Sequence, residues 1–373
     1  MSDETPGRVL PGDLIGQLNE AAHAFFRRSL PGSWVPGYLT GRGLGEDLQQ
    51  LWQTGYAPAS WDALTLHLRA EGFCDSLIET AGLARRSRRG TLIDVFRDRA
   101  MLPIRSDNGR IIAFIGRAAD PPGPRVPKYL NSPRTSLYDK STELFGLAEA
   151  REALTAGAQP VIVEGPFDAI AVTTACHGRN AGVAPCGTAL TIRQIRALAQ
   201  IADLKATGVL GAFDADPAGR RAAVRAYYLL SQVTPRTSAA ILAPGRDPAQ
   251  ILEEDGPGML AATLASRTQP LADLVVDAVL EKWSRWTPYP PGQVNALHAA
   301  AAVIAAMPAA HVARQVARLA DQLALDYATV TDAVTSVLPK VIRREAVATA
   351  TRQRRKPRTA VAARMPVIGR HDS

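Results

Sequence analysis

Residues 160 to 243 hold the pattern that most restricts the fold, because short apolar runs alternate there with stretches of helical periodicity. Four runs read as strands: Val161–Val163, Ala181–Ala184, Val209–Phe213 and Ala239–Leu242. Short apolar runs separated by helices are typical of a parallel sheet with helices on its faces. The sequence therefore predicts an α/β domain, which we place at residues 148–262.

Acidic residues follow three of these four predicted strands. They are Glu164 and Asp168 after the first strand, Asp214 and Asp216 after the third, and Asp247 after the fourth. The carboxyl ends of parallel strands lie at one edge of an open sheet, where ligands bind. We expect these carboxylates to converge on one crevice.

The spacing of Asp214 and Asp216 indicates a use for the carboxylates. Side chains two residues apart on an extended backbone point to the same side. Carboxylates held so close raise one another's pKa, and a hard cation such as Mg²⁺ relieves the repulsion. Helix capping, worth about 1 kcal/mol for each aspartate, is the alternative. Capping does not explain why the acids gather at one edge, so we predict a metal site.

The region before this domain, residues 13–147, is predicted to be a subdomain of mixed helical and β structure. Apolar residues recur at helical spacing from Asp13 to Arg28, and Tyr38 to Gly43 marks a break before a second short helix. Two β-rich runs, Met101–Ile104 and Arg110–Phe114, flank the turn residues 107–109. These runs predict a hairpin.

The same subdomain is strongly basic. Between Arg85 and Lys140 there are thirteen basic residues and five acidic ones. Clustering of this kind in a folded segment is an electrostatic footprint for phosphate backbones. The sequence therefore places a candidate nucleic-acid surface before the acidic domain.

The two acidic patterns, taken in order, resemble a known domain. Glu-Gly-x-x-Asp at residues 164–168 and Asp-x-Asp with Gly219 after it look like the Toprim domain. Bacterial primases, type IA and type II topoisomerases, and some nucleases and recombination proteins share that domain. The resemblance implies a parallel-sheet fold and divalent metal chemistry on nucleic acids.

Upstream motifs narrow the resemblance to one family. The central motif is Pro127–Pro133, which is followed by Leu137–Lys140 and Leu144–Leu147; further matches are Tyr38–Leu44, Gly55–Pro58, Phe96–Arg99, Gly109–Arg117 and Gly187–Thr191. Over roughly residues 20–260 the chain resembles the catalytic core of bacterial DnaG-type DNA primases. The resemblance implies template-directed synthesis of short RNA primers on single-stranded DNA from ribonucleoside triphosphates, by metal-dependent nucleotidyl transfer.

The resemblance also implies roles for individual residues. Glu164 is expected to act as an acid or base near the attacking 3′-hydroxyl, or as a metal ligand. Asp214 and Asp216 are expected to hold Mg²⁺ or Mn²⁺, with Asp168 and Asp247 adding carboxylates to the same crevice. The positions expected to hold template and nucleotide are Arg42, Arg97, Arg99, Arg117, Lys128, Asn131 and Lys140.

Two departures from the family pattern affect these expectations. The third acidic motif of the family carries a second aspartate two residues after Asp247, where this sequence has Ala249. The zinc-binding domain that normally precedes the core is not expected here, since residues 1–12 read as a flexible lead-in. Cys74, Cys176 and Cys186 do not form a zinc pattern. The chain is therefore expected to lack zinc and to use a separate zinc-binding template-recognition protein, or none.

The rest of the chain is predicted to be helical and then disordered. Residues 263–338 are rich in Ala and Leu at helical spacing, broken at Thr287 to Gly292, and weakly resemble the segment that docks on the replicative helicase. A helical bundle closing the core is an equally open interpretation. Residues 339–373 form a basic tail with no apolar period. No apolar run approaches the length of a membrane span, so we expect a cytoplasmic protein with no membrane partner.

Two other functions stay open at this level. A non-catalytic DNA- or helicase-binding accessory descended from a primase would fit Ala249 and the expected lack of a zinc domain. A Toprim nuclease would explain the acidic residues but leaves the motif Pro127–Pro133, which contains Lys128, unexplained. A topoisomerase needs a further domain with a nucleophilic tyrosine, for which the sequence has no room.

Overall fold

The computed structural model describes residues 11–121, 123, 126–187 and 189–337 of the chain. It divides into two compact units between residues 278 and 279. The predicted domain boundaries at residues 147 and 262 both lie inside the first unit and stay predictions. Most of the predicted lead-in, residues 1–10, and the predicted basic tail, residues 339–373, lie outside the described residues.

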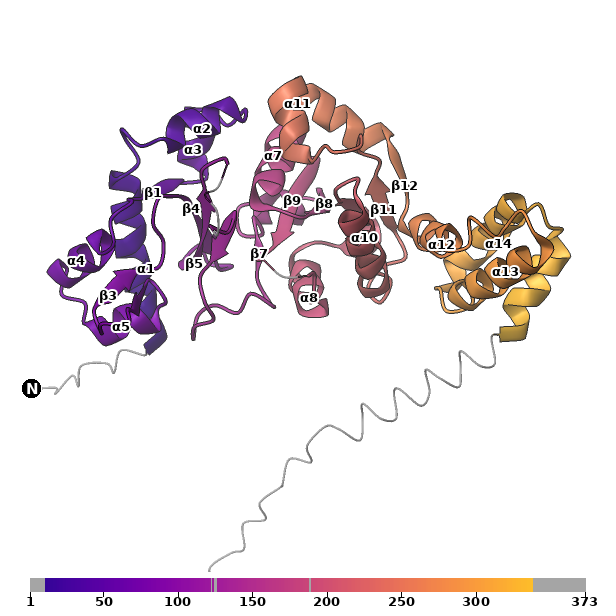
Figure 1. Ribbon diagram of the computed structural model, residues 1–373. Helices are drawn as coiled ribbons and strands as arrows, with labels where there is room; N and C mark the ends of the chain where they lie inside the picture. Colours follow the sequence, from indigo (N-terminus) through magenta and orange to yellow (C-terminus); the bar gives the residue numbers. More distant parts are fainter. Residues whose placement is uncertain (1–10, 122, 124–125, 188, 338–373) are drawn as a thin grey trace, which may run out of the picture. The chain divides into compact units, whose positions relative to one another are not determined.

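Short helices and a four-stranded antiparallel sheet form the first part of unit one (Figure 1). The sheet has the order β1 (Gly55–Ala57), β4 (Arg99–Arg105), β5 (Ile111–Ala118) and β6 (Tyr129–Asn131). A separate hairpin joins β2 (Ala84–Arg86) to β3 (Leu92–Asp94). The helices are α1 (Pro11–Arg28), α2 (Val35–Gly41), α3 (Glu46–Leu51), α4 (Ala63–Ala70) and α5 (Asp75–Thr80).

The core under these helices is built from aromatic rings. Phe26 of α1 and Phe114 of β5 cross edge to face at 5.4 Å, and Phe96 packs on Phe114 at 6.4 Å. All three are at most 1 % exposed. Burying a side chain of this size contributes about 1.5–3 kcal/mol, so the three rings fix α1 on the sheet.

The structure confirms the helix predicted from residue 13 and the hairpin across residues 107–109. Strands β4 and β5 pair antiparallel with Pro103 opposite Phe114, and Gly109 takes the left-handed backbone (φ +80°) that the turn needs. The predicted break at Tyr38 to Gly43 is wrong for its first half. Helix α2 runs through Tyr38 to Gly41, and the chain turns at Gly43 (φ +75°).

A six-stranded sheet forms the second part of unit one, in the order β12, β11, β10, β8, β9, β7. The four predicted strands are β8 (Gln159–Val163), β9 (Asn180–Pro185), β10 (Val209–Ala212) and β11 (Thr237–Ala240), and they are mutually parallel. The two edge strands, β7 (Leu144–Phe145) and β12 (Thr268–Pro270), are antiparallel to their neighbours. The predicted parallel α/β arrangement is confirmed.

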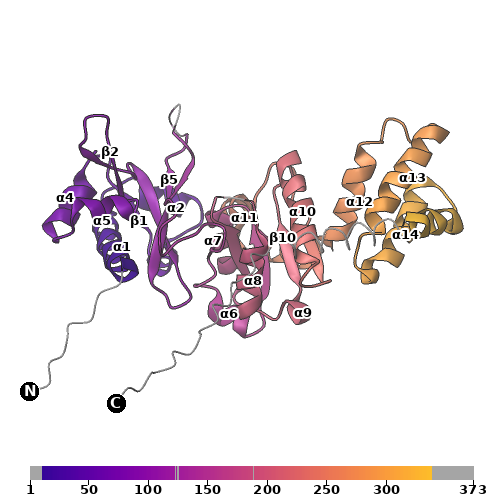
Figure 2. The ribbon, with the colours of Figure 1, turned by 90° about the horizontal axis from the view of Figure 1, so that it is seen from below.

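Helices cover both faces of this sheet, as the uninterrupted burial of its inner strands requires. Figures 1 and 2 show α7 (Pro166–Cys176) and α11 (Pro248–Ser266) packed together on one face. The other face carries α8 (Ile192–Ile201) and α10 (Pro217–Leu230). Two short helices, α6 (Arg151–Thr155) and α9 (Leu204–Thr207), lead into β8 and β10.

The second unit is helical in the residues described. Helix α12 (Leu271–Glu281) crosses into it and is followed by α13 (Pro290–Ile304), α14 (Ala309–Leu323) and a helix at residues 327–337. The predicted break at Thr287 to Gly292 ends earlier than expected, because α13 begins at Pro290, a favoured first residue of a helix. Within the described residues no helix is both long and apolar enough to cross a membrane.

Candidate active site

The predicted acidic residues follow the carboxyl ends of parallel strands. Val163 of β8 pairs with Ala212 of β10, so Glu164 and Asp214 lie one and two residues beyond a paired position. Glu164 Oε1 accepts a hydrogen bond of 3.2 Å from the backbone amide of Asp214. The two neighbouring strand ends are therefore joined through the carboxylate of Glu164.

Two other acids cap helices. The Asp216 side chain accepts from the Gly219 amide at 2.7 Å, and the Asp247 side chain accepts from the Gln250 amide at 2.7 Å. They are the N-cap residues of α10 and α11. The capping alternative is therefore confirmed for Asp216, and Asp247 forms a cap that was not predicted. Strand β10 ends at Ala212, so Asp214 and Asp216 lie beyond the strand, and their predicted alternation on one side stays a prediction.

Asp168 is buried between two helices rather than open to the crevice. It is 8 % exposed, and it accepts from the amides of Gly165 (3.1 Å) and Ala249 (3.2 Å). These bonds join the first turn of α7 to the first turn of α11. Burial, and next the charge of Asp247, raise the pKa of Asp168 above its usual range. Its role as a metal ligand stays a prediction. The contacts described are hydrogen bonds of a buried side chain that connects two helices.

The carboxylates interact electrostatically. Burial and, after it, the charges of Glu164, Asp247 and Asp216 together raise the pKa of Asp214 to about 6, while Lys128 acts in the opposite direction. Burial also raises the pKa of Glu164, with contributions from Asp216 and Asp247. Glu164, Asp214, Asp216 and Asp247 therefore share one electrostatic environment.

The donor set has the chemistry that Mg²⁺ or Mn²⁺ prefers, namely carboxylate oxygens that repel one another without a cation. The side chains that would hold such an ion are Glu164, Asp214, Asp216 and Asp247. Within the described part of the chain, however, no three His, Cys, Asp or Glu side chains are already grouped to hold a metal. Asp216 and Asp247 are engaged as helix caps, which accounts for this difference from the expected cluster.

In the metal-free protein we expect the Asp214 carboxyl to titrate near pH 6 rather than at its ordinary value of 3.8. The folded-state pKa is the higher one, so this group stabilises the fold at acid pH, and that contribution is lost as the pH rises through about 6. Cation binding has the opposite dependence, because it requires the ionised form and weakens below pH 6.

Carboxyl ¹³C NMR of the metal-free protein measures this titration. Asp247→Asn should lower the pKa of Asp214, because it removes one repelling charge while keeping a good capping residue. A wild-type titration near pH 4 for Asp214 would contradict the described environment.

Lys128 is a predicted binding residue whose charge acts on these acids. Its side chain is exposed, its Nζ lies 5.9 Å from the centre of the Tyr129 ring, and its charge lowers the pKa of Asp214. Asn131, also in the motif, lies against Gly187, where a Cβ would be 2.2 Å from its Nδ2. Lys140 is exposed on a loop that contacts α8.

Four predicted arginines are instead engaged by protein groups. Arg99 (4 % exposed) donates to the carbonyls of Gly116 and Pro127, both at 3.0 Å. Arg117 (0 % exposed) donates to the Ala118 carbonyl and pairs with Asp120. Arg97 donates to the Asp94 carbonyl and stacks 4.3 Å from the Trp61 ring. Phosphate binding by these residues stays a prediction.

The fourth, Arg42, connects the two parts of unit one. It donates to the Tyr38 hydroxyl at 3.0 Å and pairs at 3.6 Å with both Asp120 and Glu253, the latter on α11. Its side chain is 17 % exposed. In this arrangement Arg42 holds the basic subdomain against α11.

Sequence reasoning did not select the tyrosines of this region. Tyr129 and Tyr38 lie 5.2 and 5.8 Å from the Arg117 guanidinium. The Tyr129 hydroxyl lies 3.8 Å from the position of a Cβ on Gly165, and burial and the charge of Asp168 raise its pKa. The available signal was the position of Tyr129 directly after Lys128 in the motif.

Comparisons with known proteins agree with this architecture. Residues 161–252 match a family described as Toprim-like, and residues 26–151 match one described as DNA primase catalytic core, N-terminal domain. The sheet and its acidic edge thus define a Toprim-containing protein.

Two solved structures and a curated relative narrow this class. A DNA primase domain from Pseudomonas aeruginosa is 30 % identical, with a TM-score of 0.71 over 86 % of this chain and 99 % of that one. A DnaG primase catalytic domain bound to single-stranded DNA is 27 % identical, with a TM-score of 0.70 over 86 % and 99 %. A DNA primase from Pseudomonas putida is 37 % identical over 279 residues, 73 % of this chain and 41 % of the relative.

The chain belongs to the family of bacterial DnaG-type DNA primases, of which it spans the catalytic core. It covers about two fifths of the length of the curated relatives that it matches.

Proposed function

We propose that this chain synthesises short RNA primers on single-stranded DNA by template-directed, metal-dependent nucleotidyl transfer. The observation that carries the proposal is the hydrogen bond by which Glu164 joins the ends of β8 and β10, beside Asp214 and under the influence of Lys128. Carboxylates and a cation at one sheet edge suit a reaction in which positioning and charge neutralisation do most of the catalysis.

Divalent cations, when bound, would neutralise charge on the phosphates of the incoming nucleotide. Glu164, Lys128 and Asp214 would have different roles at these phosphates. Glu164 is exposed and has a raised pKa, which suits it to accept the proton of the primer 3′-hydroxyl. Lys128 is exposed and can contact a phosphate, and Asp214 holds its carboxylate next to Glu164 through the backbone bond.

The proposed partners follow from the family. A relative's catalytic domain binds single-stranded DNA, and we propose the same template for this chain, with ribonucleoside triphosphates as substrates. The helical second unit is proposed to dock on a replicative helicase. A separate zinc-binding protein is proposed to choose the initiation site.

A non-catalytic accessory is the second candidate, and one observation favours it. Ala249, at the position of the family's additional aspartate, is 5 % exposed and its amide bonds Asp168. The third acidic loop thus offers one carboxylate fewer, and the space there is filled by protein. An accessory would bind DNA without incorporating nucleotides.

Incorporation of labelled ribonucleotides on single-stranded templates distinguishes the two candidates. We expect template-dependent RNA products with Mg²⁺ or Mn²⁺ and none with EDTA. DNA binding without product under either metal, with and without a helicase, would support the accessory and overturn the proposal.

A further inference from the structure

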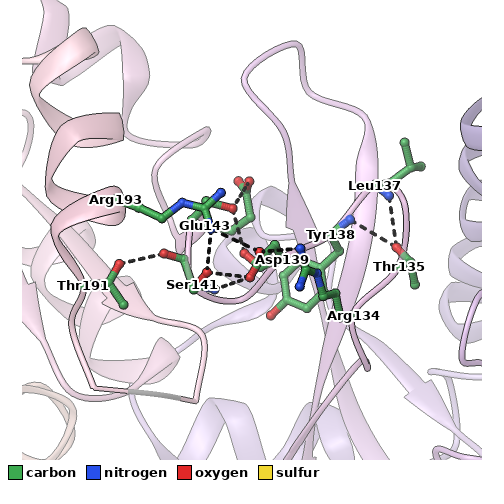
Figure 3. Close-up of polar contacts among 10 residues, drawn as sticks. Arg134, Thr135, Leu137, Tyr138, Asp139, Ser141, Glu143, Thr191 and Arg193 are labelled. Carbon is green, nitrogen blue, oxygen red and sulfur yellow. Dashed lines mark hydrogen bonds and ion pairs between the residues drawn. The ribbon is translucent and has the colours of Figure 1, made fainter. Parts of the chain in front are cut away.

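Two arginines from distant parts of the chain meet on one carboxylate oxygen. Arg134 Nη2 and Arg193 Nη1 lie 3.3 and 3.4 Å from Asp139 Oδ2. Figure 3 shows Asp139 between the two, with Arg193 projecting from α8. The arginine side chains are 77 % and 58 % exposed, whereas Asp139 is 21 % exposed. The guanidinium groups therefore face solvent while the acid lies beneath them.

The other oxygen of Asp139 is already engaged. Oδ1 accepts from the Ser141 amide at 2.9 Å and from the Ser141 hydroxyl at 2.6 Å. These bonds, and next the two arginines, hold the pKa of Asp139 below its usual range, so it stays ionised. The Asp139 carboxylate thus faces two guanidinium groups, and the exposed Lys140 is the next residue of the chain. With Glu143 of the same loop counted, three cations stand against two acids, which leaves this cluster an excess of one positive charge.

The first turn of α8 holds this loop in place. The Thr191 hydroxyl donates to the Ser141 carbonyl at 2.6 Å, as Figure 3 shows. The fully buried Gln194 amide donates to the carbonyls of Lys140 (3.0 Å) and Glu143 (2.9 Å). Since these bonds fix the backbone from Lys140 to Glu143 on the first turn of α8, the loop that carries Asp139 and Lys140 has a rigid base.

The cluster lies next to the acidic edge of the sheet. A cavity of about 230 Å³ is lined by Glu164 together with Pro185, the last residue of β9, and Leu190 of the loop that follows. Thr191, which bonds the Asp139 loop, is the next residue of that loop. A strand that reaches Glu164 can thus continue past the arginines along one edge.

We propose that Arg134, Lys140 and Arg193 form a phosphate-binding site for the backbone of a nucleic-acid strand that extends from the active site. The inference rests on the proposed function and adds to it, because neither Arg134 nor Arg193 was among the residues expected to bind template or nucleotide. Guanidinium groups match the geometry of phosphate oxygens, and a phosphodiester would supply the missing negative charge.

Salt dependence of DNA binding tests the site, with fluorescein-labelled single-stranded DNA and fluorescence anisotropy. In R134A/R193A we expect DNA affinity to fall by the same factor for oligonucleotides of unrelated sequence. The plot of log affinity against log salt concentration should have a slope shallower by about 0.7 for each phosphate that the protein no longer neutralises. R134K/R193K should retain most of the slope, because the charges remain. The matched control is R179A/K205A, which removes two exposed cations before β9 and β10, at the opposite edge of the sheet.

Three outcomes overturn the site. The first is a slope in R134A/R193A that equals that of the control. The second is an equal reduction in the alanine and lysine variants, because charge would then not be the cause. The third is a raised KM for ribonucleotides with unchanged DNA binding, which would assign the cations to the nucleotide. Wild-type protein that binds no single-stranded DNA would instead remove the proposed function itself.

Discussion

Asp214→Asn/Asp216→Asn is expected to lower the rate of ribonucleotide incorporation by roughly 10²–10³-fold, about 3–4 kcal/mol of transition-state stabilisation. The substitution removes two of the four charges that crowd this edge while leaving similar side-chain volume. Asparagine is as good an N-cap as aspartate, so the amide oxygen introduced at position 216 can still accept from the Gly219 amide. The measurement is single-turnover primer extension at saturating Mg²⁺.

Binding and stability measurements separate chemistry from folding in this variant. Single-stranded DNA affinity should be retained or rise slightly, because two negative charges are removed, and the thermal unfolding midpoint should stay near that of the wild type. Incorporation at close to the wild-type rate would remove these aspartates from the active site. The same decrease accompanied by an unfolded protein would leave the cap as the cause, and Asp216→Asn alone then shows which aspartate is responsible.

Gly219→Ala is expected to lower incorporation by roughly 10²-fold although it adds only a methyl group. A Cβ at residue 219 would lie 2.0 Å from the Asp214 carbonyl oxygen, and the obstacle is backbone, which cannot rotate away. The turn that carries Asp214 must therefore move relative to Glu164. Because KM for the template depends on other surfaces, we expect the change mainly in kcat.

The matched control for this variant is Gly258→Ala in α11, where nothing lies within 4 Å of the added Cβ. It makes the same chemical change on an exposed helix and should leave kcat unchanged. Equal activity of the two alanine variants would show that the turn tolerates the displacement, and that the separation of Asp214 from Glu164 is not critical.

The central sheet could be predicted from the sequence because its inner strands are apolar on both faces. Val161–Val163 and Val209–Phe213 could hardly be placed elsewhere than under helices. The edge strands β7 and β12 could not be predicted, since they have two and three residues, and Thr268–Pro270 has no apolar pattern. These two strands pair because they lie beside the edges of the folded sheet, and that depends on the tertiary structure and not on the local sequence.

The site, like the sheet, could be predicted in part from the sequence. Chain order and strand ends place Glu164 and Asp214 together, because parallel topology leaves little freedom. The orientation of the Asp216 and Asp247 side chains depends on the helix that follows each of them. Pro217 and Pro248, at the first position of α10 and α11, indicate that the preceding aspartates are N-cap residues. Burial of Arg99 and Arg117 could not be predicted, because it depends on carbonyls and on rings from other segments.

The ion pair of Arg42 with Glu253 has a consequence for any attempt to divide this chain into separately expressed halves. A fragment comprising only the six-stranded sheet and its helices would leave Glu253 on α11 without its cation. The fragment would have one more unpaired carboxylate, that of Glu253, on its surface, and it would also lack Lys128. Such a fragment should repel DNA more strongly than the intact chain, so weak binding by it would reflect the cut and not the intrinsic affinity of the sheet.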